Sequence, residues 1–500
     1  MKIPRFLFAA AVASLAIPSL ASPQHKRAGG LWIDPTQSGW GLNLFHQGST
    51  VFGSLFVYGP DGQPRWYTAS NMVNSDDGAI HDHPTGVGGD LYEATGPYFG
   101  GPFDPSRVTR RKVGIINIDL GNNLTGVVYS IDGVTVITNN LVPFTFRPDN
   151  ISGDYIGYRW QPPAGEFNSG PEVKDEVTIH INDNGSNVTM TTIGTDASHP
   201  ACTYSGTRSQ NRDFVGASGS FACSGTSGQW AMGVDVSPDG IMGSFIGNGI
   251  SSFWGRIGAA RTANVVDTGT GLYNDLWFPA DEGGWGINFL DQGDTAFATL
   301  FVYDPQGRSH WYSASELHRA GPNADDDRYE YVGPLYESTG PYYGTSFNPS
   351  SVNRRVVGTM AFEPTLDKKS ADVTYTVDGV QVRKRVSRFA FAKNSLAGTY
   401  VGHVLDIPGG TPEAVNITVL DGDATTVMDT SSSRGTCRYT SPVMQTGELR
   451  QLEGTFSCSD GRGGSFRMHD IALQWNGFMG WMDAAGMASG KIEGVRTQVN

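Results

Sequence analysis

Polar and aromatic residues that could hold a ligand occur twice in the chain, in matching segments. The segment "SGWGLNLFHQG" (38–48) returns as "GGWGINFLDQG" (283–293), and "LYEATGPYFG" (91–100) returns as "LYESTGPYYG" (335–344). Flat aromatic faces stack on sugar rings and other planar molecules, while amide, carboxylate and guanidinium groups fix the orientation of a ligand. We therefore predict two equivalent ligand-binding sites. The first contains Trp40, Asn43, Gln47, Trp66, Tyr67, Tyr92, Glu93 and Arg111, and the second contains Trp285, Asn288, Gln292, Trp311, Tyr312, Tyr336, Glu337 and Arg355.

The same residues also have a purely structural interpretation. Trp and Tyr are frequent in protein cores, and a repeated Arg–Glu pair can brace a loop. Trp66 and Tyr67 are adjacent on a predicted strand, as are Trp311 and Tyr312, so the two members of each step point to opposite faces. We expect one member of each step to be buried and the other to be displayed.

Acid–base catalysis is a weaker alternative. A glycoside hydrolase needs two carboxyl groups across one bond, and Glu93 is the clearest carboxylate shared by the two copies. A lyase-like arrangement would combine Tyr92, Glu93 and Arg111. The chain contains no phosphate-binding Gly-rich loop, no His-Glu-x-x-His and no Gly-x-Ser-x-Gly. No residue is therefore assigned a catalytic role.

The segment "HDHP" (81–84) could bind a metal, because His81 and His83 would share one face of a strand. The second copy has "NADDDRYE" in the corresponding region, without the His pair. We therefore interpret the segment as a solvated loop and expect neither a metal nor a cofactor.

The four cysteines form two matched pairs. Cys202 and Cys223 are separated by the same number of residues as Cys437 and Cys458, and both pairs lie in matching text. Since each copy should carry its own bond, we predict disulfides Cys202–Cys223 and Cys437–Cys458. Each should stabilise the fold by about 3 kcal/mol in the chain-entropy model.

The N-terminal sequence indicates export. Lys2 and Arg5 precede the apolar run "FLFAAAVASLAI", and small residues follow up to Ala21. This is the pattern of a signal peptide over residues 1–21, and it predicts a secreted or periplasmic protein cleaved near Ala21. The formal net charge of −14 argues against nucleic acid as a partner, because like charges repel. No later segment predicts membrane insertion.

The repeated segments belong to a duplication of the whole chain after the signal peptide. Each copy divides near its middle, which predicts β sub-domains at 29–148, 149–262, 271–393 and 394–497. Asp132-Gly133 and Asp378-Gly379 stand between β-branched runs and predict tight hairpins. About six to eight short strands per sub-domain favour an all-β tandem duplication. Each unit would contain two small antiparallel barrels, with sandwiches as the alternative and a disulfide in the second barrel.

The phrases around "SGWG" and "WY" resemble those of a set of secreted proteobacterial proteins that are largely uncharacterised. The resemblance covers residues 30–70 and 272–315. It implies secretion and a β-rich domain, and it transfers no catalytic residue.

The favoured function is non-catalytic binding of an extracellular polysaccharide or a small planar ligand, since tandem sites raise avidity for repetitive ligands. A secreted polysaccharide lyase or hydrolase is the second hypothesis. A protein-binding factor, such as an inhibitor of a secreted enzyme, is the third.

Overall fold

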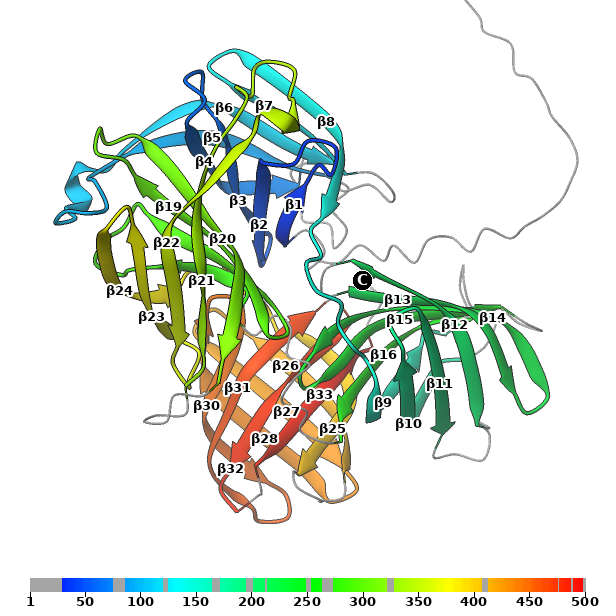
Figure 1. Ribbon diagram of the computed structural model, residues 1–500. Helices are drawn as coiled ribbons and strands as arrows, with labels where there is room; N and C mark the ends of the chain where they lie inside the picture. The colour runs from blue at the N-terminus through cyan, green and yellow to red at the C-terminus, as the bar shows by residue number, and fades with distance from the viewer. Residues whose placement is uncertain are drawn as a thin grey trace, which may run out of the picture.

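The protein consists of four antiparallel β-barrels in two tandem units (Figure 1). The computed structural model describes residues 29–74, 86–119, 125–163, 171–194, 201–211, 214–248, 253–262, 273–321, 328–406, 412–474, 476–486 and 489–497. The prediction of barrels rather than sandwiches, in two units with a disulfide in the second barrel of each, is confirmed.

Barrel 1 is a closed meander in which each strand pairs with the next and β8 pairs back with β1. Its β7–β8 hairpin turns at Asp132 and Gly133, which have φ angles of 48° and 85°, as the Asp-Gly signal predicts. A short 3-10 helix, η1 (Pro105–Arg107), precedes β6. The strands are β1 (Gly30–Ile33), β2 (Gly41–Gln47), β3 (Thr50–Tyr58), β4 (Pro64–Asn74), β5 (Gly86–Thr95), β6 (Thr109–Asp119), β7 (Thr125–Ile131) and β8 (Val134–Pro143).

Barrel 2 completes the first unit and closes through pairing of β16 with β9. Its Cys202–Cys223 disulfide joins two residues that oppose each other on β12 and β13. The strands are β9 (Gly153–Gln161), β10 (Val173–Asp183), β11 (Asn187–Gly194), β12 (Cys202–Asn211), β13 (Phe214–Cys223), β14 (Thr226–Ser237), β15 (Gly240–Asn248) and β16 (Phe253–Arg261).

Barrel 3 repeats barrel 1, including the Asp-Gly turn at Asp378 and Gly379 and a short 3-10 helix, η2 (Pro349–Ser351). The strands are β17 (Asp275–Phe278), β18 (Gly286–Gln292), β19 (Thr295–Tyr303), β20 (Ser309–Ala320), β21 (Glu330–Thr339), β22 (Asn353–Pro364), β23 (Ser370–Val377) and β24 (Val380–Arg388).

Barrel 4 repeats barrel 2, with one extra short strand, β29, beside β30. Pairing of β28 with β30 closes the sheet, and the Cys437–Cys458 disulfide links opposing residues of these two strands. Both disulfide predictions are therefore confirmed. The strands are β25 (Gly398–Asp406), β26 (Glu413–Asp421), β27 (Thr425–Ser432), β28 (Gly435–Pro442), β29 (Met444–Thr446), β30 (Leu449–Cys458), β31 (Gly463–Gln474), β32 (Gly477–Ala484) and β33 (Gly490–Arg496).

Equivalent barrels of the two units pack against each other. Barrel 1 lies against barrel 3, and barrel 2 lies beside barrel 4 (Figure 1). Trp160 and Met242 of barrel 2 cluster with Val401, Met479 and Val495 of barrel 4. The duplicated chain thus resembles a two-fold symmetric dimer joined into one polypeptide.

Two loops are exchanged between barrels 1 and 3. Phe99, in the loop after β5 of barrel 1, lies 6.0 Å from the ring of Tyr312 in barrel 3. Tyr343, in the loop after β21 of barrel 3, lies 6.3 Å from the ring of Tyr67 in barrel 1. Each barrel therefore contributes an aromatic plug to the core of the other.

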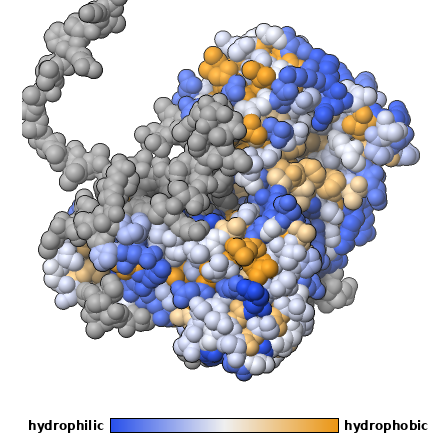
Figure 2. Space-filling model, turned by 180° about the vertical axis from the view of Figure 1, so that it is seen from behind, coloured by the Kyte–Doolittle hydropathy of each residue, from blue (hydrophilic) through white to orange (hydrophobic). Residues whose placement is uncertain are grey.

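On the face seen in Figure 2, hydrophobic residues lie in separate patches among hydrophilic ones. Among the described residues, no helix is both long and apolar enough to cross a membrane.

Candidate functional site

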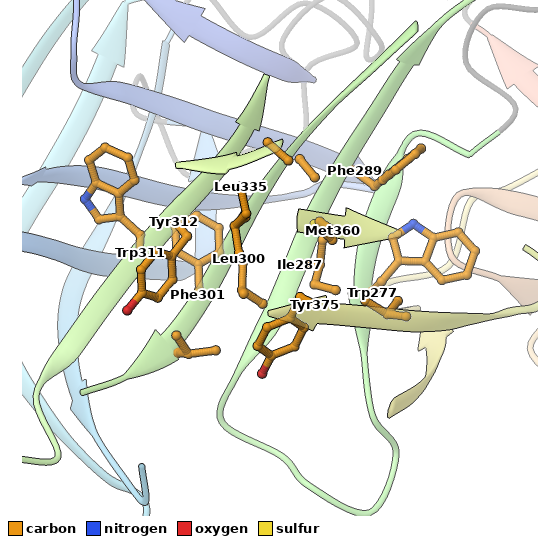
Figure 3. Close-up of a cluster of buried hydrophobic side chains, with 14 of the residues drawn as sticks. Trp277, Ile287, Phe289, Leu300, Phe301, Trp311, Tyr312, Leu335, Met360 and Tyr375 are labelled. Carbon is orange, nitrogen blue, oxygen red and sulfur yellow. The ribbon is translucent and has the colours of Figure 1, made fainter. Parts of the chain in front are cut away.

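The two repeated tryptophans of the Trp-Tyr steps join barrel 1 to barrel 3. Trp66 Nε1 donates a hydrogen bond to the Val302 carbonyl (3.0 Å), and Trp311 Nε1 donates to the Val57 carbonyl (3.1 Å). Figure 3 shows Trp311 on the side of the third barrel that faces the blue strands of barrel 1. These reciprocal bonds explain why both copies keep the same residue, because each tryptophan donates a hydrogen bond to the backbone of the other barrel.

The tyrosines of the same steps point into the barrels. Tyr67 and Tyr312 are each 5% exposed, and the paired tryptophans are also buried. The expectation that one member of each step is displayed is wrong, because the outer face of each strand is covered by the other barrel. Burial, followed by the nearby Glu93 charge, raises the pKa of Tyr67 to about 12.

The repeated glutamines hold the segments that leave the barrels. Gln47 Oε1 accepts hydrogen bonds from the backbone N–H of Phe391 (2.8 Å) and Ala392 (3.2 Å), beyond the end of barrel 3. Gln292 Oε1 accepts from Phe146 and Arg147, both at 3.0 Å, beyond the end of barrel 1. Both glutamines are therefore interface residues.

The repeated asparagines, Asn43 and Asn288, differ in the hydrogen bonds that their side chains make. Asn43 Nδ2 donates to Thr299 Oγ1 across the interface (3.3 Å). Asn288 is 1% exposed, and among the described residues neither its amide oxygen nor its amide nitrogen has a hydrogen-bond partner. Such a buried amide costs about 1–3 kcal/mol when it stays unpaired. The second copy thus carries an amide whose hydrogen bonds the fold does not satisfy.

Asn288 lines a cavity of about 350 Å³ between barrels 1 and 3. The walls are mainly apolar and include aromatic rings, with Phe52 and Trp66 from barrel 1 and with Trp285, Phe301 and Phe389 from the second unit. Arg110 is the one charged residue in the described lining, and its guanidinium lies 4.5 Å from the centre of the Tyr92 ring. The cavity combines flat apolar walls with the Asn288 amide, the hydroxyls of Ser54, Thr68 and Ser70 and the Arg110 guanidinium, which suits a small planar molecule with polar groups on its edge.

Trp40 lies apart from this cavity. It is buried in the core of barrel 1, whereas its counterpart Trp285 lines the cavity. Of the predicted residues, the cavity therefore unites Trp66, Trp285 and Asn288.

The predicted carboxylates and arginines form surface braces instead. Arg111 pairs with Glu93 (2.8 Å) and Asp132 (2.5 Å), and thus ties the β7–β8 hairpin to β5. Arg355 pairs with Glu337 (2.7 Å) and Asp378 (2.7 Å) in the same way. A hydrogen bond from His310, helped by Arg355, outweighs partial burial and lowers the pKa of Glu337.

The lyase-like arrangement of Tyr92, Glu93 and Arg111 is not assembled in the described structure. Tyr92 and Glu93 are adjacent on β5, and the Tyr92 hydroxyl donates to Asp90 (3.4 Å) while Arg111 binds Glu93 and Asp132. Tyr336 has the same position in barrel 3, with Arg354 3.5 Å from its ring centre. The "HDHP" segment lies outside the described residues.

Several cavity residues were missed by the prediction, although a signal for them exists. Phe52 recurs as Phe297, and Phe389 recurs as Phe144, in matching text. Arg110 also recurs, as Arg354. Retention of these residues in both copies could have placed them beside the repeated tryptophans.

Comparison with protein-family models, with curated proteins and with solved structures found no match.

Proposed function

We propose that the protein is an exported, non-catalytic binding protein whose ligand is a small planar molecule held between barrels 1 and 3. The observation that carries this proposal is the unpaired, buried amide of Asn288 in an aromatic cavity. A ligand with one donor and one acceptor would satisfy the amide and stack between aromatic walls. The signal-like N-terminus and the two disulfides support export.

The cavity favours a small planar ligand over a glycan chain. Trp66 and Trp285 are almost fully buried, so they form walls of a partly open cavity rather than a flat, exposed platform along which a polysaccharide could lie. Asn43 Nδ2 bonds to Thr299 while its Oδ1 has no hydrogen-bond partner among the described residues, and Asn43 is not part of the cavity lining. One site built around Asn288 is therefore favoured over two equivalent ones.

Catalysis remains the second hypothesis, and binding of a protein remains the third. The described cavity lining contains neither a carboxylate nor an imidazole, so it does not supply the acid–base pair that a hydrolase needs. This supports binding over turnover.

The test replaces the unpaired amide by an apolar side chain of similar size. We expect Asn288→Leu to raise the free energy of unfolding of the ligand-free protein by about 1–3 kcal/mol, because a buried unpaired amide is removed. The same change should weaken binding of the probe indole-3-carboxamide by roughly tenfold to a hundredfold, since the ligand's hydrogen bonds are lost. Chemical denaturation and titration calorimetry measure the two effects.

Asn43→Leu is the matched control. It removes the bond to Thr299, and we expect it to lower stability by about 1 kcal/mol while leaving probe affinity unchanged. A panel of planar amides and a panel of glycans should be screened in parallel. Binding of glycans alone, or equal effects of the two variants on stability and affinity, would refute the proposal.

A further inference from the structure

Barrel 2 encloses a second cavity, distant in the fold from the one at the interface of barrels 1 and 3. It has a volume of about 320 Å³ and lies inside the barrel at the end that carries the Cys202–Cys223 disulfide. Most of its walls are apolar side chains from the barrel core, among them Val177, Met190, Tyr204, Trp230 and Phe245. This volume is near the lower end of the range for small-molecule sites.

One ion pair stands in the wall of this apolar cavity. Arg159 Nη2 donates to Asp175 Oδ2 (2.9 Å), from opposing positions on β9 and β10. The Asp175 side chain is 3% exposed, and Arg159 Nε is buried with no hydrogen-bond partner in the part of the chain that the structure describes. Because removing charges from water is costly, an ion pair here is weak evidence for a stabilising role.

Barrel 4 shows that the fold does not need this pair. Val404 and Glu413 oppose each other on β25 and β26, where barrel 2 has Arg159 and Asp175. Glu413 instead binds Ser432 and Arg434. The apolar frame is otherwise shared, since Val415, Tyr439 and Met468 correspond to Val177, Tyr204 and Met232. The two copies thus differ at the polar position of the barrel interior.

We propose that barrel 2 is a separate binding site for a small, uncharged, mainly apolar molecule with one oxygen acceptor, such as a ketone. The hydrocarbon part would fill the apolar cavity, and the oxygen would accept a hydrogen bond from the Arg159 guanidinium. Asp175 already neutralises Arg159, so an uncharged oxygen is preferred to a carboxylate, which Asp175 would repel. This site is independent of the planar-ligand site proposed above.

The test measures binding of 2-nonanone to the full-length protein by titration calorimetry, with nonanoate and 1-nonene as comparators. We expect 2-nonanone to bind at least tenfold more tightly than either comparator. Val177→Phe should fill the cavity and weaken 2-nonanone binding at least tenfold. Val415→Phe, at the equivalent position of barrel 4, should leave the affinity unchanged.

A double variant keeps the proposal testable if Val177→Phe fails to fold. Arg159→Leu combined with Asp175→Leu removes the pair without leaving a lone charge, a change that proteins often tolerate. The double variant should still bind 1-nonene. Its ratio of 2-nonanone affinity to 1-nonene affinity should be at least tenfold lower than that of the native protein. Asn288→Leu should not alter 2-nonanone binding. Absence of 2-nonanone binding, an unchanged preference in the double variant, or equal loss with Val415→Phe would overturn the proposal.

Discussion

At the scale of single residues, His403 is a titratable group enclosed between barrels 2 and 4. Its side chain is fully buried and lies 2.9 Å from Glu493 of its own barrel and 2.9 Å from Glu176 of barrel 2. Its ring stacks on Tyr158 at 4.8 Å. Burial alone would lower the pKa of His403, but the hydrogen bonds and charges of the two glutamates outweigh burial and raise it. Burial also raises the pKa of Glu493, against the opposing effect of His403.

These shifts predict that the contact between barrels 2 and 4 weakens as the pH rises. A raised folded-state pKa means that the folded protein holds the His403 proton more tightly than the unfolded chain does. The stabilisation is therefore complete below the ordinary pKa of about 6.5 and is lost as the pH rises through the raised value. The raised pKa of Glu493 acts in the same direction, from its ordinary value upward.

Calorimetric melting between pH 6 and pH 9 checks this prediction, with His403→Gln as the variant. The native protein should lose stability relative to this variant as the pH increases. His180→Gln is the control, because His180 pairs with Asp154 on an exposed surface outside the interface. A native-minus-variant difference that does not change with pH for His403→Gln would contradict the assignment.

At the scale of elements, the segment after each first barrel is held by the opposite unit. Gln47 at the end of β2 accepts from the backbone of Phe391 and Ala392, and its Nε2 donates to the Phe389 carbonyl (2.9 Å). One side chain thus replaces a strand partner for the chain that links barrel 3 to barrel 4. Gln292 has the same role for the link between barrels 1 and 2.

We predict that Gln47→Leu lowers the free energy of unfolding by about 3 kcal/mol. Leucine fills a similar volume, but it leaves buried backbone groups without partners, and each such group is costly. Denaturant unfolding measures the loss. Gln306→Leu, at an exposed turn position, should change stability by less than about 0.5 kcal/mol. Equal stability of the two variants would show that the hydrogen bonds of the Gln47 side chain contribute little to folding.

The barrels themselves could be predicted from local sequence, whereas the burial of their outer faces against another barrel could not. Asp132-Gly133 and Asp378-Gly379 determine hairpin turns through positive φ angles, which are local properties. Strand β3 is buried on both faces from Gly53 onward. The alternation of apolar and polar residues along the strand therefore did not show which face belongs to the barrel core. Burial of Trp66 depends on Val302, which lies more than two hundred residues later in the chain. Repetition identified these residues but could not separate an interface from a ligand site, and the unpaired state of Asn288 is visible only in the assembled structure.

At the scale of the whole molecule, the two units form a self-complementary pair. The face of barrel 1 that carries Phe56 and Trp66 meets the equivalent face of barrel 3, with Phe301 and Trp311. Symmetric interfaces of this type occur in homodimers, where the same patch binds its own copy. The cleft around Asn288 exists only where both units are present.

We predict that residues 29–262, produced alone in an oxidising compartment, associate into a homodimer through the face that barrel 3 covers in the full chain. Exposed aromatic surface of this extent drives association. Light scattering after size exclusion measures the mass. Trp66→Glu in the same fragment should shift it toward the monomer, because a charge would be buried in the interface. A native fragment that is folded and monomeric would contradict this prediction.

The exchanged plugs impose an order on biosynthesis. Barrel 1 ends at Pro143, but the residue that enters its core, Tyr343, is translated about two hundred residues later. At about 5–20 residues per second, the ribosome needs roughly 10–40 s to supply that residue. During this interval barrel 1 is a nearly complete barrel with an open aromatic end, and a second nascent chain could fill that end with its own plug. Docking of the second unit within one chain therefore competes with association between two chains. Because only the second process depends on chain concentration, the relative rates of the two determine the yield of correctly folded protein.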